Sequence, residues 1–145
     1  NPKLEKFIII GNKKEIPRKV LKNHFVEVDD FDDRERLIKL LSNAEYYISA
    51  SQIENSSIAA LEGLIFSNNV VLSDIPSHRE LLEDNNFEVI YEEKSKARFL
   101  MARNNPVAAE PQTFSGPLLP PLFSAIPCAF LNLKPILVTR DPNNK

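Results

Sequence analysis

Short apolar runs alternate with amphipathic stretches along the first hundred residues. The run from Phe7 to Ile10, which ends at a Gly-Asn turn, is typical of a buried strand. Residues 32–43 instead place apolar side chains at helical spacing behind acidic residues, which favour a helix N-terminus. The full pattern predicts strands at 7–10, 25–28, 46–49, 69–73 and 87–91, and helices at 32–43, 57–66, 76–83 and 92–103.

Strands that alternate with helices of this length favour βαβ units. We therefore predict an α/β fold with a Rossmann-like parallel sheet and helices on both faces. Ligands of such sheets bind beyond the carboxyl ends of the strands. This rule directs attention to residues 11–14, 50–57 and 73–77, each of which follows a predicted strand.

Composition changes near residue 100. Residues 101–145 hold 8 of the 11 prolines, together with many large apolar side chains. Proline disfavours both continuous helices and central strands. The sequence thus predicts a Rossmann-like domain at 1–100 and a Pro-rich apolar tail at 101–145, which we expect to be extended chain packed across another surface.

Overall composition excludes several classes of function. The 145 residues carry a net charge of −2, which gives no electrostatic basis for binding nucleic acid. One cysteine and two distant histidines provide neither a disulfide framework nor a zinc motif. No apolar run approaches the roughly 20 residues of a membrane-spanning helix.

The segment 50–64, ASQIENSSIAALEGL, joins a polar turn to an apolar helix. Asn55, Ser56 or Ser57 can cap this helix, because their side-chain oxygens accept free backbone N–H groups. The first turn, which begins at Ile58, contains no acidic residue. Its N–H groups and the positive end of the helix dipole therefore remain available to an anion such as phosphate.

Two glutamates bracket this turn, with seven residues between Glu54 and Glu62. Carboxylates repel phosphate but accept strong hydrogen bonds from sugar hydroxyls. A ligand that carries both groups, such as a nucleotide sugar, fits the combination. The spacing alone leaves an alternative interpretation open, in which Glu54 is a solvated loop residue and Glu62 is a surface helix residue.

The order of these residues resembles the donor-binding core of the family 4 glycosyltransferases, which have the GT-B fold. The resemblance covers about residues 5–95. The family usually has Gly-Phe-Gly-like residues where this chain has Asn55-Ser56-Ser57. The matching positions are Ser51, Glu54, Glu62, Ser73, Asp74, Pro76 and Glu80.

The resemblance implies a retaining, hexosyltransferase-type enzyme that uses a nucleotide-diphosphate sugar and needs no metal or cofactor. Its acceptor would be a glycan or a lipid-linked molecule in surface polysaccharide or glycolipid biosynthesis. Glu62 would bind the ribose, and Glu54, the expected catalytic residue, would lie beside the transferred sugar. The other expected donor-binding residues are Asn55, Ser56, Ser57, Ile58, Gly11 and Val28.

In the family, a basic Arg/Lys pair that neutralises the diphosphate belongs to a segment before the FIIIGN strand, and an N-terminal domain binds the acceptor. By this resemblance we expect the chain to be the donor-binding half of a GT-B enzyme and to be inactive alone. We expect the parent protein to be cytoplasmic, and peripheral association with a membrane stays open. Lys13, Lys14 and Arg79 could substitute for the pair, although surface roles are favoured. Two alternatives remain: a non-catalytic or split subunit that docks a partner chain, and a nucleotide-sugar epimerase.

Other polar residues have simpler interpretations. His78 is expected on the surface of a helix rather than in the site, and Asp74 either binds ligand or stabilises its turn. The acidic stretch 29–33 lacks the spacing of a calcium loop and is explained as helix N-terminal charge. Tyr46 and Tyr47 are expected to be strand residues.

Overall fold

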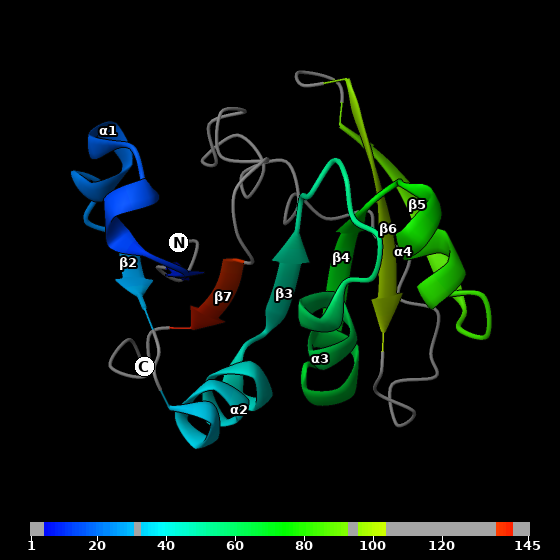
Figure 1. The fold of residues 1–145 in the computed structure, drawn as a ribbon, viewed down its shortest axis with the longest axis horizontal. Coiled ribbons are helices and arrows are strands. Elements are labelled where there is room, and N and C mark those ends of the chain that lie inside the picture. The colour runs from blue at the N-terminus through cyan, green and yellow to red at the C-terminus, as the bar shows by residue number, and fades with distance from the viewer. Residues whose placement is uncertain (1–4, 31–32, 93–95, 104–135, 141–145) are drawn as a thin grey trace.

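A seven-stranded β-sheet forms the centre of the computed structural model, which describes residues 5–30, 33–92, 96–103 and 136–140 (Figure 1). The strands lie in the order β2-β1-β7-β3-β4-β6-β5. Their bounds are β1 Glu5–Ile10, β2 Val26–Asp29, β3 Tyr46–Ser49, β4 Asn69–Ser73, β5 Phe87–Glu92, β6 Ala97–Arg103 and β7 Ile136–Arg140.

Strand direction follows the predicted βαβ pattern in the first part of the chain. β1 pairs with β2, and β3 with β4, in parallel. Because β7 is antiparallel to both β1 and β3, the first four strands all run the same way. β6 is antiparallel to β4 and β5. The α/β, Rossmann-like class is confirmed, with two antiparallel strands added to the parallel ones.

The helices begin close to the predicted positions. Asp33 caps α2, because its side chain accepts a hydrogen bond from the Glu35 amide at 2.9 Å, which supports the helix N-terminal interpretation of the acidic stretch. Pro76 occupies the first position of α4, where its missing N–H costs nothing. The bounds are η1 (a 3₁₀ turn) Lys13–Glu15, α1 Arg18–Leu21, α2 Arg34–Asn43, α3 Ile58–Phe66 and α4 Pro76–Leu81.

Alternate strand residues fill two cores, one on each face of the sheet. On one face, Ile9, Ile48 and Val71 lie in the same cluster as Val20 of α1. On the other face, residues such as Ile8 and Leu72 pack in a cluster with side chains of α2 and α3. That second cluster includes Leu37, Leu41, Tyr47, Ala60 and Leu82. Helices therefore cover both faces, as predicted.

The weak helix predicted at 92–103 is wrong. Residues 97–103 form β6, which pairs with β4 on one side and β5 on the other. The run Phe99–Ala102 is buried at every position, so its apolar pattern has no period that separates a buried strand from a buried helix. Its two neighbouring strands decide the conformation.

β7 places part of the Pro-rich tail inside the sheet, between β1 and β3. The five residues ILVTR contain no proline, so every backbone N–H of β7 can join the ladder. The expectation that the tail avoids central strands fails for this stretch. Residues 104–135 and 141–145 lie outside the described part of the chain.

Close packing of α3 against β3 depends on Gly63. A Cβ at this position would lie 2.5 Å from Cδ1 of Tyr47, well inside normal contact distance. Gly63 therefore lets the helix backbone rest directly on the tyrosine ring, and it sets the depth at which α3 sits.

Replacing Gly63 with alanine should destabilise the fold. Although alanine favours helix by about 1 kcal/mol, overpacking against Tyr47 should lower the free energy of unfolding by a net value of about 1–3 kcal/mol. Urea denaturation measures this change. In a Tyr47→Leu background the same substitution should lose most of its cost, because the ring is gone. An equal cost in both backgrounds would contradict the contact.

Candidate functional site

The loops that follow β1, β3 and β4 lie at one edge of the sheet, because these strands run in the same direction (Figure 1). The loop after β3 carries Glu54 and leads into α3. The loop after β4 carries Asp74 and leads into α4. The sheet thus brings all three predicted loops, including the Gly11 turn, to one edge.

The N-terminus of α3 has the form that the sequence predicts. Of the three candidate caps, Ser57 is used, and its Oγ accepts a hydrogen bond from the Ala60 amide at 3.2 Å. The first turn contains no acidic residue, and Ile58 is largely exposed. Asn55 and Ser56 are exposed in the preceding loop. The positive end of the helix dipole is therefore not neutralised by a residue of its own first turn.

Glu62 is held by an arginine that sequence reasoning did not single out. Its Oε1 accepts a hydrogen bond from Nη1 of Arg34 at 2.7 Å, across the contact between α2 and α3. The Glu62 side chain is 16% exposed, whereas that of Arg34 is 68% exposed. The sequence did contain a signal for this pair. Arg34 lies in the first turn of α2, where a cation is unfavourable beside the positive end of the helix dipole, so a partner outside the helix is expected.

Glu54 differs from Glu62. Its side chain is half-buried in the loop, and no described residue forms a hydrogen bond or ion pair with it. A partly buried carboxylate without a partner can accept hydrogen bonds from a ligand. Among the described residues, the two glutamates therefore differ: Glu62 is paired with Arg34, whereas Glu54 has no partner.

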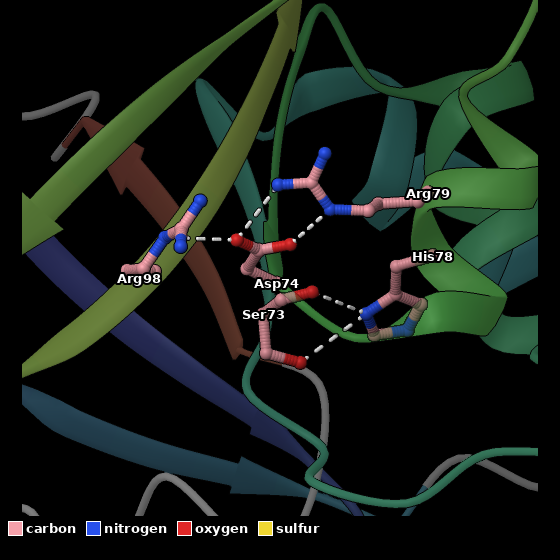
Figure 2. A network of polar contacts seen from close by, with 5 residues as sticks. All are labelled: Ser73, Asp74, His78, Arg79 and Arg98. Carbon is pink, nitrogen blue, oxygen red and sulfur yellow. Dashed lines mark hydrogen bonds and ion pairs between the residues drawn. The ribbon is translucent and has the colours of Figure 1, made fainter.

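A hydrogen-bond network joins the loop after β3 to the end of β4 and to α4, and Figure 2 shows the part between Ser73 and His78. Oγ of Ser73 donates to the backbone oxygen of Ser51, and Oγ of Ser51 donates to the Ile53 oxygen at 3.2 Å. Nδ1 of His78 lies 2.9 Å from the Ser73 oxygen and 3.2 Å from its Oγ. Because the carbonyl only accepts, Nδ1 carries the proton. The loop that carries Glu54 is thereby tied to α4.

The predicted surface position of His78 is wrong, since the side chain is fully buried. A histidine in the first turns of a helix is normally solvated, but here the ring points inward to satisfy the end of β4. Its burial depends on Ser73, which lies in another element, so the local sequence pattern could not reveal it.

Asp74 stabilises its turn, which was one of the two interpretations left open. Its carboxylate bonds to Nε and Nη2 of Arg79, the latter at 2.9 Å, and lies 3.0 Å from Nε of Arg98 (Figure 2). The hydrogen bonds from Arg79, helped by the charges of both arginines, lower the pKa of Asp74 although burial opposes them. Arg79 is thus engaged by Asp74 and does not replace a phosphate-binding pair.

The remaining predicted residues lie on β2 or in the segment that directly follows β1. The Gly11 amide donates to the Asp29 oxygen at 2.9 Å, which closes the turn after β1. Val28 is half-buried and packs against the core cluster of Ile9 and Val20. Asp29 is buried and pairs with Arg36 at 2.6 Å. Lys13 and Lys14 are exposed, in agreement with the favoured surface role.

Two general features complete the description. Within the part of the chain that the structure describes, no three His, Cys, Asp or Glu side chains gather closely enough to hold a metal ion. No helix in the described ranges is long and apolar enough to cross a membrane.

Comparison with known families gives an identification. A model of the group 1 glycosyl transferases matches residues 5–104, which is more than half of the chain. The chain belongs to the group 1 glycosyl transferases. Searches of curated proteins and of solved structures found no significant match.

Membership of this family supports a role in glycosyl transfer, with a sugar donor and an acceptor as substrates. The matched region runs from the start of β1 to just past β6, so it contains Glu54, Glu62 and the Ser73–His78 network. Both edge loops belong to the glycosyl transferase domain.

The Asp74 network predicts a pH-dependent contribution to stability. A carboxyl whose pKa is lowered on folding stabilises the fold above its unfolded pKa, ordinarily 3.8, and this stabilisation is lost as the pH falls through the folded value. Asp74→Asn should therefore lower the free energy of unfolding at pH 7 by about 1–2 kcal/mol, since both arginines are partly solvated.

Urea denaturation between pH 7 and pH 3 measures this effect. The difference from the wild type should shrink below pH 3.8, while the exposed control Asp84→Asn should show little effect throughout. A constant difference across the range would show that the charge of Asp74 is not responsible.

Proposed function

We propose that this chain is the donor-binding part of a retaining glycosyltransferase that uses a nucleotide-diphosphate sugar. The observation that carries the proposal is the placement of the uncharged α3 N-terminus beside Glu62, within the matched family region. The acceptor is a glycan or a lipid-linked molecule, bound by a further domain of a GT-B enzyme. The parent acts in the cytoplasm, in surface polysaccharide or glycolipid biosynthesis.

The α3 N-terminus suits the diphosphate of the donor. Backbone N–H groups around Ser56, Ser57 and Ile58 point out of the first turn, where the helix dipole favours an anion. Such fixed dipoles also stabilise the charge that develops on the leaving diphosphate. The proposal needs no resident cofactor, because the donor is itself a substrate.

Glu62 suits the ribose hydroxyls. Arg34 uses only Oε1, so Oε2 remains available among the contacts of the described residues. An ion pair this exposed on one side contributes under about 1 kcal/mol, whereas each charge-assisted hydrogen bond from a ribose hydroxyl contributes about 1.5–3 kcal/mol. A ribose therefore competes well for the carboxylate, and Arg34 keeps it oriented.

Glu54 is assigned to the transferred sugar. Its carboxylate, which pairs with none of the described residues, can accept hydrogen bonds from sugar hydroxyls or stabilise positive charge at the anomeric carbon. The Ser73–Ser51 hydrogen bond fixes the start of its loop, which is how a protein presents a loop residue with defined geometry.

One observation favours a second candidate, a donor-binding subunit that docks a partner chain. Ile58, Leu61 and Ile65 lie at helical spacing on α3, and all three are exposed. Ile53 in the preceding loop is exposed as well. Apolar side chains gathered on one helix face are typical of a surface that another domain or chain covers. Product analysis with the parent protein separates the two candidates, since a non-catalytic subunit binds donor without transferring sugar.

The main test is a calorimetric titration of the full chain with UDP, GDP, ADP and their hexose derivatives. We expect saturable binding for one nucleotide, and Glu62→Ala should weaken it by about 1.5–3 kcal/mol through loss of the diol contacts. Glu83→Ala, an exposed glutamate just after α4, is the matched control and should bind as the wild type does. No saturable binding for any nucleotide would overturn the proposal, and unchanged binding by Glu62→Ala would remove Glu62 from the site.

A further inference from the structure

Ser73, the last residue of β4, has a hydroxyl that connects two parts of the site edge. Its Oγ donates a hydrogen bond to the backbone oxygen of Ser51, in the loop after β3, and lies 3.2 Å from Nδ1 of His78. A serine hydroxyl carries one proton, so it donates in one direction at a time. The direction of this proton therefore decides whether the loop after β3 is held by β4.

His78 leaves the Ser73 hydroxyl only one direction. Nδ1 of His78 lies 2.9 Å from the backbone oxygen of Ser73, which can only accept, so Nδ1 carries a proton. A protonated Nδ1 offers no lone pair to the hydroxyl. Among the described residues that Oγ contacts, the Ser51 oxygen is then the acceptor that remains. The imidazole thus directs the proton of Ser73 towards the loop.

The orientation of the imidazole is itself fixed by the fold. The His78 side chain is fully buried, and it points from α4 to the end of β4 (Figure 2). Its other ring nitrogen, Nε2, is buried and has no hydrogen-bond partner among the described residues. Only Nδ1 makes polar contacts there, so a rotated ring would leave its proton without an acceptor, which costs free energy.

The loop that carries Glu54 is attached at two points. Ser51 is held by Ser73, and Ser57 caps α3 through the Ala60 amide. Within the described part of the chain, no side chain of residues 52–56 forms a hydrogen bond with another element. Glu54 lies midway between the two attachments, and only the one at Ser51 connects it to a neighbouring strand.

We propose that Ser73 and His78 are positioning residues for Glu54. His78 directs the Ser73 proton to the Ser51 oxygen, and this hydrogen bond holds the loop so that the Glu54 carboxylate faces the transferred sugar. The inference rests on the proposed function, which assigns Glu54 to that sugar. It adds two residues that act on the sugar only through the loop.

Ser73→Ala tests the proposal, because it removes the hydroxyl but keeps the backbone oxygen that His78 contacts. The Kd for the nucleotide sugar that binds best in the titration panel should rise about three- to tenfold. The Kd for the matching nucleoside diphosphate should change by less than about twofold, because Glu54 faces the sugar. Ser73→Thr keeps a hydroxyl and should restore binding of the nucleotide sugar.

A second pair of variants tests the role of His78. His78→Leu removes the Nδ1 donor and should weaken nucleotide-sugar binding as Ser73→Ala does. His78→Asn keeps an N–H donor near the position of Nδ1 and should bind better than His78→Leu, since Nε2 has no partner to lose among the described residues. The control is Ser42→Ala, because the exposed Ser42 donates only within α2, to the Ile38 oxygen at 2.8 Å, and this variant should bind both ligands as the wild type does.

A double-mutant cycle shows whether the effect passes through Glu54. In a Glu54→Ala background, Ser73→Ala should have no further effect on the Kd for the nucleotide sugar. A measurement without ligand tests the loop directly. Ser73→Ala should change the NMR amide shifts of residues 52–55 in the free chain, whereas Ser42→Ala should not.

Several results would overturn the proposal. Nucleotide-sugar binding by Ser73→Ala that equals the wild type would do so, as would equal weakening of both ligands, which indicates a purely structural hydroxyl. An undiminished effect in the Glu54→Ala background, unchanged amide shifts in the loop, or equal binding by His78→Asn and His78→Leu would also contradict it. Absence of all nucleotide binding by the wild type would instead refute the proposed function, and the inference with it.

Discussion

A chain of hydrogen bonds runs from the buried imidazole of His78 through Ser73 to the Ser51 carbonyl, and the geometry of the site depends on it. Loops at the edge of a sheet are the most mobile parts of a fold unless something fixes them. Here the loop after β3, which carries Glu54, is tied to Ser73, the last residue of β4. The donor-site account assumes this fixed position, because a carboxylate acts on a sugar only when its orientation is set beforehand.

Charge is distributed unevenly along this edge. At α4, Asp74 engages both Arg79 and Arg98, so the cations there are occupied by a structural role. At α3, the first turn has no acid of its own, and the nearby cation Arg34 engages Glu62. The α3 side is therefore the part of the edge where the helix dipole remains available to an anionic ligand. This contrast supports the proposed position of a diphosphate at α3, and it assigns the Asp74 cluster to stability.

Much of the fold follows from the sequence because it rests on local patterns. The bounds of β3 and β4 agree with prediction, since each is an apolar run closed by a turn. Ser57, one of three candidates, caps α3, and Asp33, which was predicted as N-terminal charge, caps α2. β6 and β7 could not be predicted in this way. Their conformations depend on pairing with strands distant in sequence, and a continuously buried run has no diagnostic period.

The same distinction between local patterns and distant contacts applies to the site. The uncharged first turn of α3 and the two glutamates were visible in a single segment. The Arg34–Glu62 pair joins residues 28 positions apart, and the burial of His78 arises only when α4 packs on the sheet. Local chemistry is thus readable from sequence, whereas the partners that orient it are set by tertiary packing.

The central claim is that the N-terminus of α3 meets the diphosphate of a nucleotide sugar. Amide chemical-shift mapping by NMR, with the nucleotide sugar added to the full chain, tests it most directly. The account predicts the largest shift changes in the backbone amides of residues 54–61, with smaller changes near Gly11. Saturable changes that cluster instead on α4 and β5, and leave the first turn of α3 unaffected, would contradict it.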